Sequence, residues 1–310
     1  MTQEDVANLL GLVGYEVIQT DSRLLLPKYV PLLARGLNRL SALAPLRWFS
    51  LTNWTVARLP LSPVGAAGVG QPLSASVVCP CRNEAGNIPN IVARLPRLGG
   101  HTELIFVEGH SKDGTYEACV KEKEEHPELD ISVYRQEGKG KKDAVWLGFS
   151  KAKCDILLIL DADLTVPPED LPAFFQAVAS GRVEFVNGSR LVYPMEGRAM
   201  RFLNLLGNKF FSLAFAFLVG QRVKDTLCGT KVLMRRDYAR LAAGRAYFGD
   251  FDPFGDFDLL YGASKLGLKI VDLPVRYQDR AYGTTQISRF RHGWRLLKMC
   301  GVALARLKLR

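Results

Sequence analysis

The 310-residue chain has no apolar run long enough to cross a membrane. The best candidate, residues 210–220, has eleven residues without a charge, and Lys209 ends it on the upstream side. A helix needs about 20 apolar residues to span a bilayer. We therefore expect any membrane contact to be peripheral.

Cysteine and histidine are few and scattered. The six cysteines have no paired spacing beyond Cys79 and Cys81, and the four histidines offer no partner set for zinc. This pattern argues against a metal–thiolate site. The N-terminus also lacks the basic and then apolar segments of a secretory signal. We expect reduced thiols and a cytosolic protein.

Acidic residues are nearly missing from the last part of the chain. Residues 276–310 hold nine Lys or Arg but one acid, Asp279, although the whole chain carries a net charge of only +10. Such a local excess predicts contact with an anionic surface or substrate. At helical spacing, residues 289–310 form a basic amphipathic helix, which either lies on anionic lipid or packs on its own domain. Its apolar face would comprise Leu296, Leu297, Cys300, Ala303, Leu304 and Leu307.

Composition divides the chain into three parts. Residues 1–70 form an N-terminal extension that ends in a linker rich in Pro, Gly and Ala. Residues 71–288 alternate between strand and helix patterns, and residues 289–310 are the basic helix. The predicted strands are 76–79, 103–108, 131–134, 156–160 and 183–187, and the predicted helices are 87–97, 113–125, 141–152 and 168–179. This alternation predicts an α/β fold, a mostly parallel sheet with helices on both faces.

One apolar strand ends in two aspartates, Asp161 and Asp163. In an open α/β sheet, ligands bind at the carboxyl ends of the strands. Two carboxylates at one strand tip repel each other unless a cation sits between them. Oxygen ligands favour Mg²⁺ or Mn²⁺, and such an ion leaves coordination positions for the phosphates of a nucleotide. The alternative is a solvated Asp-x-Asp turn.

Three other turns are expected at the same edge of the sheet. They are residues 80–84 (PCRNE), 108–115 (EGHSKDGT) and 138–142 (GKGKK). Glycine-flanked lysines that open a helix, such as Lys139 and Lys141, can form an anion cradle from backbone N–H groups and side-chain charge. The alternative is a solvated basic loop. The Asp-Gly-Thr that ends the second turn is also typical of a simple turn with a helix cap.

Together these motifs resemble an inverting family 2 glycosyltransferase of the Rossmann-like GT-A fold, close to the dolichol- or polyprenyl-phosphate sugar synthases. The likeness covers residues 75 to about 290. It is carried, in order, by 77–84 (VVCPCRNE), 105–115 (IFVEGHSKDGT), 138–140 (GKG), 161–164 (DADL), 167–171 (PPEDL) and 187–190 (NGSR).

The resemblance implies roles for individual residues. Asp161 and Asp163 would hold Mg²⁺ or Mn²⁺ on the diphosphate, and Asp256 would lie near the acceptor, as a general base if the acceptor is a hydroxyl. Asp258 in the same segment is equally well interpreted as a helix cap. Residues near the nucleotide would be Pro80, Arg82, Glu84 and Glu108, and residues facing phosphates near the acceptor would be Arg190 and Lys231.

The sequence departs from the family pattern at four positions. Arg82 stands where an aromatic residue is frequent, Glu108 where Asp is, Thr165 where Gln is, and Lys231 where Arg is. Lysine cannot form the bidentate fork that arginine makes with phosphate. These departures bear on the base and on the acceptor, and leave the implied metal and diphosphate sites intact.

Residues 1–60 resemble a different family. Residues 15–18, 24–27 and 51–58 look like the last strands and hairpin of a class I methyltransferase domain, without its glycine-rich cofactor loop. Sixty residues cannot make that domain alone, so catalysis by this part is not expected.

The resemblance implies a metal-dependent transfer of sugar from a UDP- or GDP-linked donor to a polyprenyl phosphate at the cytosolic face of a membrane, with no role for nucleic acid. One alternative keeps the fold and transfers the sugar to a hydroxyl of a lipid or glycan. Another is a non-catalytic membrane protein that binds nucleotide sugars.

Overall fold

A computed structural model describes residues 3–27, 30, 33–41, 43, 46–60, 72–190, 202–244, 256–278, 280, 282 and 289–308. Its centre is a seven-stranded sheet in the order β5-β4-β3-β6-β8-β7-β9. Strand β8 runs antiparallel to its two neighbours, and the other pairs are parallel. The strands are β3 (Ala75–Cys81), β4 (Thr102–Glu108), β5 (Asp130–Arg135), β6 (Ile156–Ile159), β7 (Phe185–Ser189), β8 (Lys231–Met234) and β9 (Ile270–Pro274).

Helices cover both faces of this sheet, as the α/β prediction requires. They are α3 (Ile88–Arg94), α4 (Thr115–Glu125), α5 (Lys141–Lys151), α6 (Leu171–Ala179), α7 (Phe202–Val219), α8 (Arg235–Ala243), α9 (Asp256–Lys265) and α10 (Arg289–Ala303). Alternate residues of a strand enter different cores, since side chains alternate across a pleated sheet. Val77 packs in the core under α3 and α6, and Val78 in the core under α5, α7 and α9. The predicted mostly parallel sheet with helices on both faces is confirmed.

The predicted elements differ from the observed ones mainly at their ends. The helix expected to reach residue 97 ends at Arg94, because Leu95 precedes Pro96 and a residue before proline disfavours the helical backbone. The helix expected from residue 168 starts as the 3₁₀ turn Pro168–Asp170 and continues as α6.

The N-terminal extension forms a small unit of its own. Strands β1 (Glu16–Arg23) and β2 (Thr52–Arg58) make a two-stranded antiparallel ribbon. Helix α1 (Gln3–Leu12) precedes the ribbon, and α2 (Leu33–Leu40) and the 3₁₀ turn η1 (Leu46–Phe49) lie between its strands. Of the segments expected to be extended, 15–18 and 51–58 lie largely in this pair, whereas 24–27 lies outside it. The resemblance to a methyltransferase tail and the domain limits 1–70, 71–288 and 289–310 remain predictions.

Three ion pairs join the N-terminal unit to the large domain. Arg58 pairs with Glu184, and Lys269 pairs with Glu16. At the other end of the ribbon, Lys308 Nζ lies 3.6 Å from Asp21 Oδ1. The ribbon is therefore attached to the large domain at points that are far apart in the sequence.

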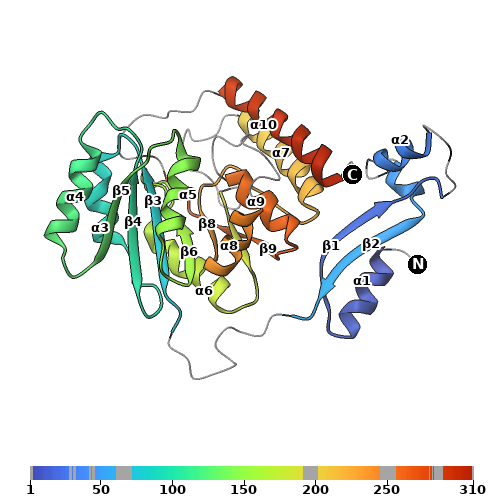
Figure 1. Cartoon of the computed structure of the whole chain (residues 1–310), viewed down its shortest axis with the longest axis horizontal. Coiled ribbons are helices and arrows are strands. Elements are labelled where there is room, and N and C mark those ends of the chain that lie inside the picture. The colour runs from blue at the N-terminus through green and yellow to red at the C-terminus, as the bar shows by residue number, and fades with distance from the viewer. Residues whose placement is uncertain are drawn as a thin grey trace.

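The basic C-terminal segment is helical, as predicted, and one of its faces packs on the protein. Helix α10 lies beside α7 (Figure 1), where Leu296, Met299 and Ala303 are buried. A π-helical turn, Leu304–Lys308, continues it. Leu297, assigned to the apolar face, is exposed instead. In the part of the chain that the structure describes, no helix combines the length and apolar character that a bilayer crossing requires.

Candidate active site

The site lies at the carboxyl edge of β3, β4 and β6. Two turns there are tied together by side chains. Asn83 donates its backbone N–H to Ser111 Oγ (3.0 Å) and accepts one from Lys112 (2.8 Å). The backbone N–H of Glu84 donates to Thr115 Oγ1 at 3.0 Å. These bonds give the expected turns 80–84 and 108–115 one fixed arrangement.

Each of the two aspartates after β6 has a cationic partner from another element. Asp161 Oδ1 lies 2.6 Å from Nζ of Lys141, the first residue of α5. Asp163 Oδ2 lies 2.6 Å from Nη2 of Arg280. Thr165 donates its N–H and its hydroxyl to Asp163 Oδ1, at 3.1 and 2.8 Å. The repulsion expected between two carboxylates at one strand tip is thus compensated by protein cations.

Arg280 also reaches the first turn, where its Nη1 lies 3.1 Å from Oε1 of Glu84. Burial raises the pKa of Glu84, and the charge of Arg280 and a hydrogen bond from Asn87 oppose that rise. Arg280 therefore connects two predicted site residues, and sequence reasoning counted it only among the basic residues of the C-terminal part. A pairing across 117 residues leaves no local pattern in the sequence.

The backbone after Asp225 closes one side of Asp161. A side chain at Gly229 would overlap with both Asp161 Oδ2 and Lys141 Nζ. Lys231, which begins β8, is fully buried and donates its ammonium to the carbonyl of Cys228. Lys231, predicted to face phosphate, therefore supports the loop that lies against Asp161.

Arg190 is engaged in a bidentate pair. Its Nε and Nη2 donate to the two carboxylate oxygens of Asp225, at 2.7 and 2.8 Å. Burial alone would raise the pKa of Asp225, but the hydrogen bonds from Arg190, its charge and two backbone N–H groups together lower that pKa. Contact of Arg190 with phosphate remains a prediction, and the same holds for Lys231.

Of the residues predicted to lie near the nucleotide, Pro80 is half-buried, Arg82 is exposed and Glu108 is buried. Glu108 accepts a hydrogen bond from the N–H of Ser111. It also borders a polar cavity of about 220 Å³, together with His110, Ser111, Gly114, Thr115, Tyr116, Glu117 and Arg135. The cavity lies beside the turns assigned to the nucleotide, and its lining does not include the two aspartates.

The three lysines of the predicted anion cradle have three different environments. Lys139 is exposed, and its N–H donates to Asp143 Oδ2 at 2.9 Å. Lys141 points to Asp161, as described above. Lys142 is buried and lies 3.1 Å from Oδ2 of Asp258 in α9. The first turn of α5 thus connects the two-aspartate motif with the helix predicted to border the acceptor.

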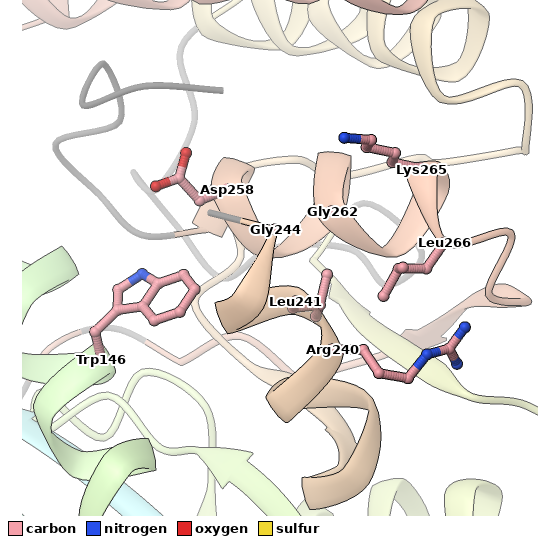
Figure 2. A pocket seen from close by; sticks show the side chains of 8 residues that line it. All are labelled: Trp146, Arg240, Leu241, Gly244, Asp258, Gly262, Lys265 and Leu266. Carbon is pink, nitrogen blue, oxygen red and sulfur yellow. The ribbon is translucent and has the colours of Figure 1, made fainter. Parts of the chain in front are cut away.

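Asp256 is the first residue of α9, and its side chain lies outside the described residues. Two residues later, Asp258 lines a small cavity of about 70 Å³ between α5, α8 and α9 (Figure 2). A cavity of this volume holds only a few water molecules, too few to match a sugar or a nucleotide. Figure 2 shows the Asp258 carboxylate and the Trp146 ring on one side, and Arg240 and Lys265 on the other.

The two-aspartate motif fits a hard divalent cation by its chemistry. Asp161 and Asp163 supply carboxylate oxygens, and Mg²⁺ in proteins is commonly held by one or two carboxylates together with substrate phosphates and water. Within the described ranges, no third His, Cys, Asp or Glu joins them in a metal-binding group.

Comparison with known proteins agrees with this geometry. A model of the family described as "Glycosyl transferase family 2" matches residues 76–241. The Glycosyltransferase AglJ of Haloferax volcanii is 27% identical over 224 residues, 72% of this chain and 69% of that protein. The Dolichol-phosphate mannosyltransferase of Pyrococcus furiosus is 27% identical over 247 residues, 74% of this chain and 65% of that protein. The chain thus spans about two thirds of the length of these relatives.

Among solved structures, glucosyl-3-phosphoglycerate synthase from Mycobacterium tuberculosis has the same fold. Its complex with Mn²⁺, uridine diphosphate and glucosyl-3-phosphoglycerate matches with a TM-score of 0.56 and 18% identity. The match covers 79% of this chain and 81% of that one. At this level of identity, the likeness concerns the GT-A fold alone.

Proposed function

Because this chain belongs to glycosyl transferase family 2, we propose that it moves a sugar from a UDP- or GDP-linked donor to a polyprenyl phosphate, with the help of Mg²⁺ or Mn²⁺. The observation that carries the proposal is the convergence at one sheet edge of Asp161, Asp163, Lys141, Arg280 and Glu84, which come from four separate parts of the chain.

Transfer from a nucleotide sugar builds negative charge on the departing diphosphate. A divalent cation held by Asp161 and Asp163 would act as a Lewis acid for that charge. Lys141 and Arg280 add two positive charges that are already oriented at the same carboxylates. Oriented charges of this kind stabilise a transition state because little reorganisation is needed as the charge develops.

The nature of the acceptor decides whether a base is needed. A phosphate is already anionic and can attack the anomeric carbon with little deprotonation, whereas a hydroxyl needs a general base. The relation to a dolichol-phosphate mannosyltransferase supports the phosphate. If the acceptor were a hydroxyl of a lipid or glycan, Asp256 would be the base.

We propose the cytosolic face of a membrane as the place of the reaction. Helices α7 and α10 expose Phe210, Leu213, Trp294 and Leu297. In Figure 1 β3 starts at the lower side of the view, so the carboxyl edge of the parallel strands points to the upper side, where α7 and α10 lie. This arrangement supports a lipid acceptor that reaches the site from a bilayer surface.

A transfer assay tests the proposal. Purified protein with Mg²⁺ or Mn²⁺ is incubated with radiolabelled UDP- and GDP-sugars and polyprenyl phosphate. Asp163→Ala removes a proposed ligand, and Asp130→Ala, at the amino end of β5, is the matched control. We expect label in the organic phase that is lost in Asp163→Ala and retained in Asp130→Ala.

Other outcomes separate the alternatives. Metal-dependent release of nucleotide with a hydroxyl acceptor, but without lipid product, would replace the phosphate by a hydroxyl. Tight binding of nucleotide sugar without turnover for any donor would show a non-catalytic binder and overturn the proposal.

A further inference from the structure

The N-terminal unit exposes an unusual amount of apolar surface. Among the described residues, Leu33 is 54% exposed, Leu40 40%, Phe49 70% and Leu51 64%. These four residues belong to α2, to η1 and to the position just before β2. We call them the α2 surface. Large exposed apolar residues that gather in one short part of a folded chain are candidates for contact with a partner or a membrane.

Hydrogen bonds fix the rotation of α2 about its own axis, and they keep these side chains exposed. Asn38 Oδ1 accepts hydrogen bonds from the N–H groups of Leu25 and Leu26, at 2.8 and 2.9 Å, and its Nδ2 donates to the carbonyl of Leu26. Ala34 is buried on the same side. Leu33 and Leu40, seven residues apart and thus on one helix face, are held outward.

The charged residues in this part of the sequence have one sign, although Arg23 pairs with Asp21 and Arg58 with Glu184. Residues 22–59 contain six Lys or Arg and no Asp or Glu. Residues 197–224, which include α7, and residues 280–310, which include α10, also contain no acidic residue. Three separate segments that expose large apolar side chains are therefore purely basic, a composition that suits an anionic lipid surface.

The three segments lie on the same side of the molecule. Figure 1 shows α2, α7 and α10 on the upper side of the view and α1 on the lower side of the ribbon. The Lys308–Asp21 ion pair connects the turn after α10 with β1. The upper side is also the side of the carboxyl edge of the sheet.

We propose that the α2 surface inserts into the headgroup region of an anionic bilayer, as a second membrane-binding element beside α7 and α10. The inference rests on the proposed function only for the idea of a membrane-borne acceptor. Leu33, Leu40, Phe49 and Leu51 supply the apolar contact, and exposed Arg39 supplies attraction to anionic headgroups. Apolar burial combined with basic charge is how surface-lying helices bind such membranes.

Cosedimentation of the full chain with vesicles tests this inference. The vesicles contain phosphatidylcholine with phosphatidylglycerol, or phosphatidylcholine alone. Leu33→Glu/Phe49→Glu alters the α2 surface. The matched control is Leu9→Glu/Leu12→Glu on α1, where Leu12 is 83% exposed and the acidic residues Glu4 and Asp5 are near.

We expect the α2 pair of substitutions to lower the partition coefficient on the mixed vesicles by about tenfold or more, since it removes two apolar contacts and adds two negative charges. The α1 pair should stay within about twofold of the wild type, since α1 lies away from the lipid. Thermal melting checks that each variant is folded. Because the substituted residues are exposed, we expect each variant to stay folded.

Three results would overturn the inference. They are wild-type binding by the α2 variant, equal loss in both variants, and equal binding of the wild type to neutral and anionic vesicles. Gel filtration without lipid covers another occupant, because a wild-type dimer that the α2 variant breaks, with vesicle binding unchanged, would assign the surface to a second copy. The vesicle binding can follow the expected pattern while neither the wild type nor a variant transfers sugar in detergent. That result would reject the proposed function and leave this inference standing.

Discussion

Lys141 Nζ lies 2.6 Å from Asp161 Oδ1, so the first residue of α5 is paired with the first carboxylate after β6. Because this ammonium is fixed where charge would develop on the diphosphate, we expect Lys141→Met to lower kcat/KM by about 100-fold. Lys141→Arg should restore part of it. Steady-state transfer kinetics measure the loss, and Lys123→Met, at an exposed position of α4, is the control that should stay near wild type.

Gly229 has no room for a side chain, because a methyl group there would overlap with Asp161 Oδ2 and Lys141 Nζ. We predict that Gly229→Ala displaces this pair and lowers transfer activity by at least about tenfold, in the range seen when one electrostatic contact is lost. Its melting temperature should stay close to that of the wild type. Gly11→Ala, where nothing lies within 4 Å of the new atom, is the control. Normal activity of Gly229→Ala would show that the loop yields.

Much of this site could be predicted from the sequence, because its parts are local. The apolar composition of residues 156–160 predicts a buried strand that ends at Asp161 and Asp163. The carboxyl ends of parallel strands lie at one edge of the sheet. The turns 80–84 and 108–115 lie there as expected, joined by hydrogen bonds that the side chains of Asn83 and Thr115 accept from Lys112 and Glu84. The position of these residues at the ends of predicted strands is therefore enough to predict that the carboxylates and the turns lie together.

The partners of those carboxylates could not be predicted, because they come from distant segments. Arg280 pairs with Asp163 across 117 residues, and Lys142 with Asp258 in another helix. The pattern of α10 likewise shows an apolar face without showing what covers it. In the structure α7 covers Leu296 and Ala303, while Leu297 faces outward. Amphipathic spacing is the same for a protein partner and for a lipid surface.

Arg280 would compete with the proposed divalent cation for Asp163, since its guanidinium pairs with both Asp163 and Glu84. We predict that Arg280→Met binds Mn²⁺ in the absence of donor about fivefold more tightly, corresponding to the loss of an ion pair worth about 1 kcal/mol. The same variant should transfer sugar more slowly. Titration calorimetry with Mn²⁺ alone measures the affinity. Weaker or unchanged Mn²⁺ binding would contradict the idea of competition, and Arg276→Met is the control.

The buried pair of Lys142 and Asp258 connects α5 to α9, with 3.1 Å between Nζ and Oδ2. Removal of one partner leaves a buried charge without its counter-ion, so Lys142→Met should lower the free energy of unfolding by about 3–5 kcal/mol. The double variant Lys142→Met/Asp258→Leu should regain most of this loss, because both charges are then gone. Urea denaturation of the two single variants and the double variant measures the coupling. Additive losses would show that the pair does not act as a unit.

Asp225 contributes to the dependence of the free energy of unfolding on pH in the acidic range. Burial alone would raise its pKa, but the hydrogen bonds from Arg190, the charge of Arg190 and backbone hydrogen bonds together keep the pKa below its ordinary value of 3.8. A carboxyl whose pKa is lower in the folded state adds stability above the unfolded pKa, and this stability is lost as the pH falls through the folded pKa. We therefore predict that urea midpoints of the wild type decline more steeply below about pH 4 than those of Asp225→Asn. The variant is less stable at neutral pH, because Arg190 loses its counter-charge. Glu124→Gln, at an exposed position of α4, is the control, and parallel pH profiles for wild type and Asp225→Asn would refute the assignment.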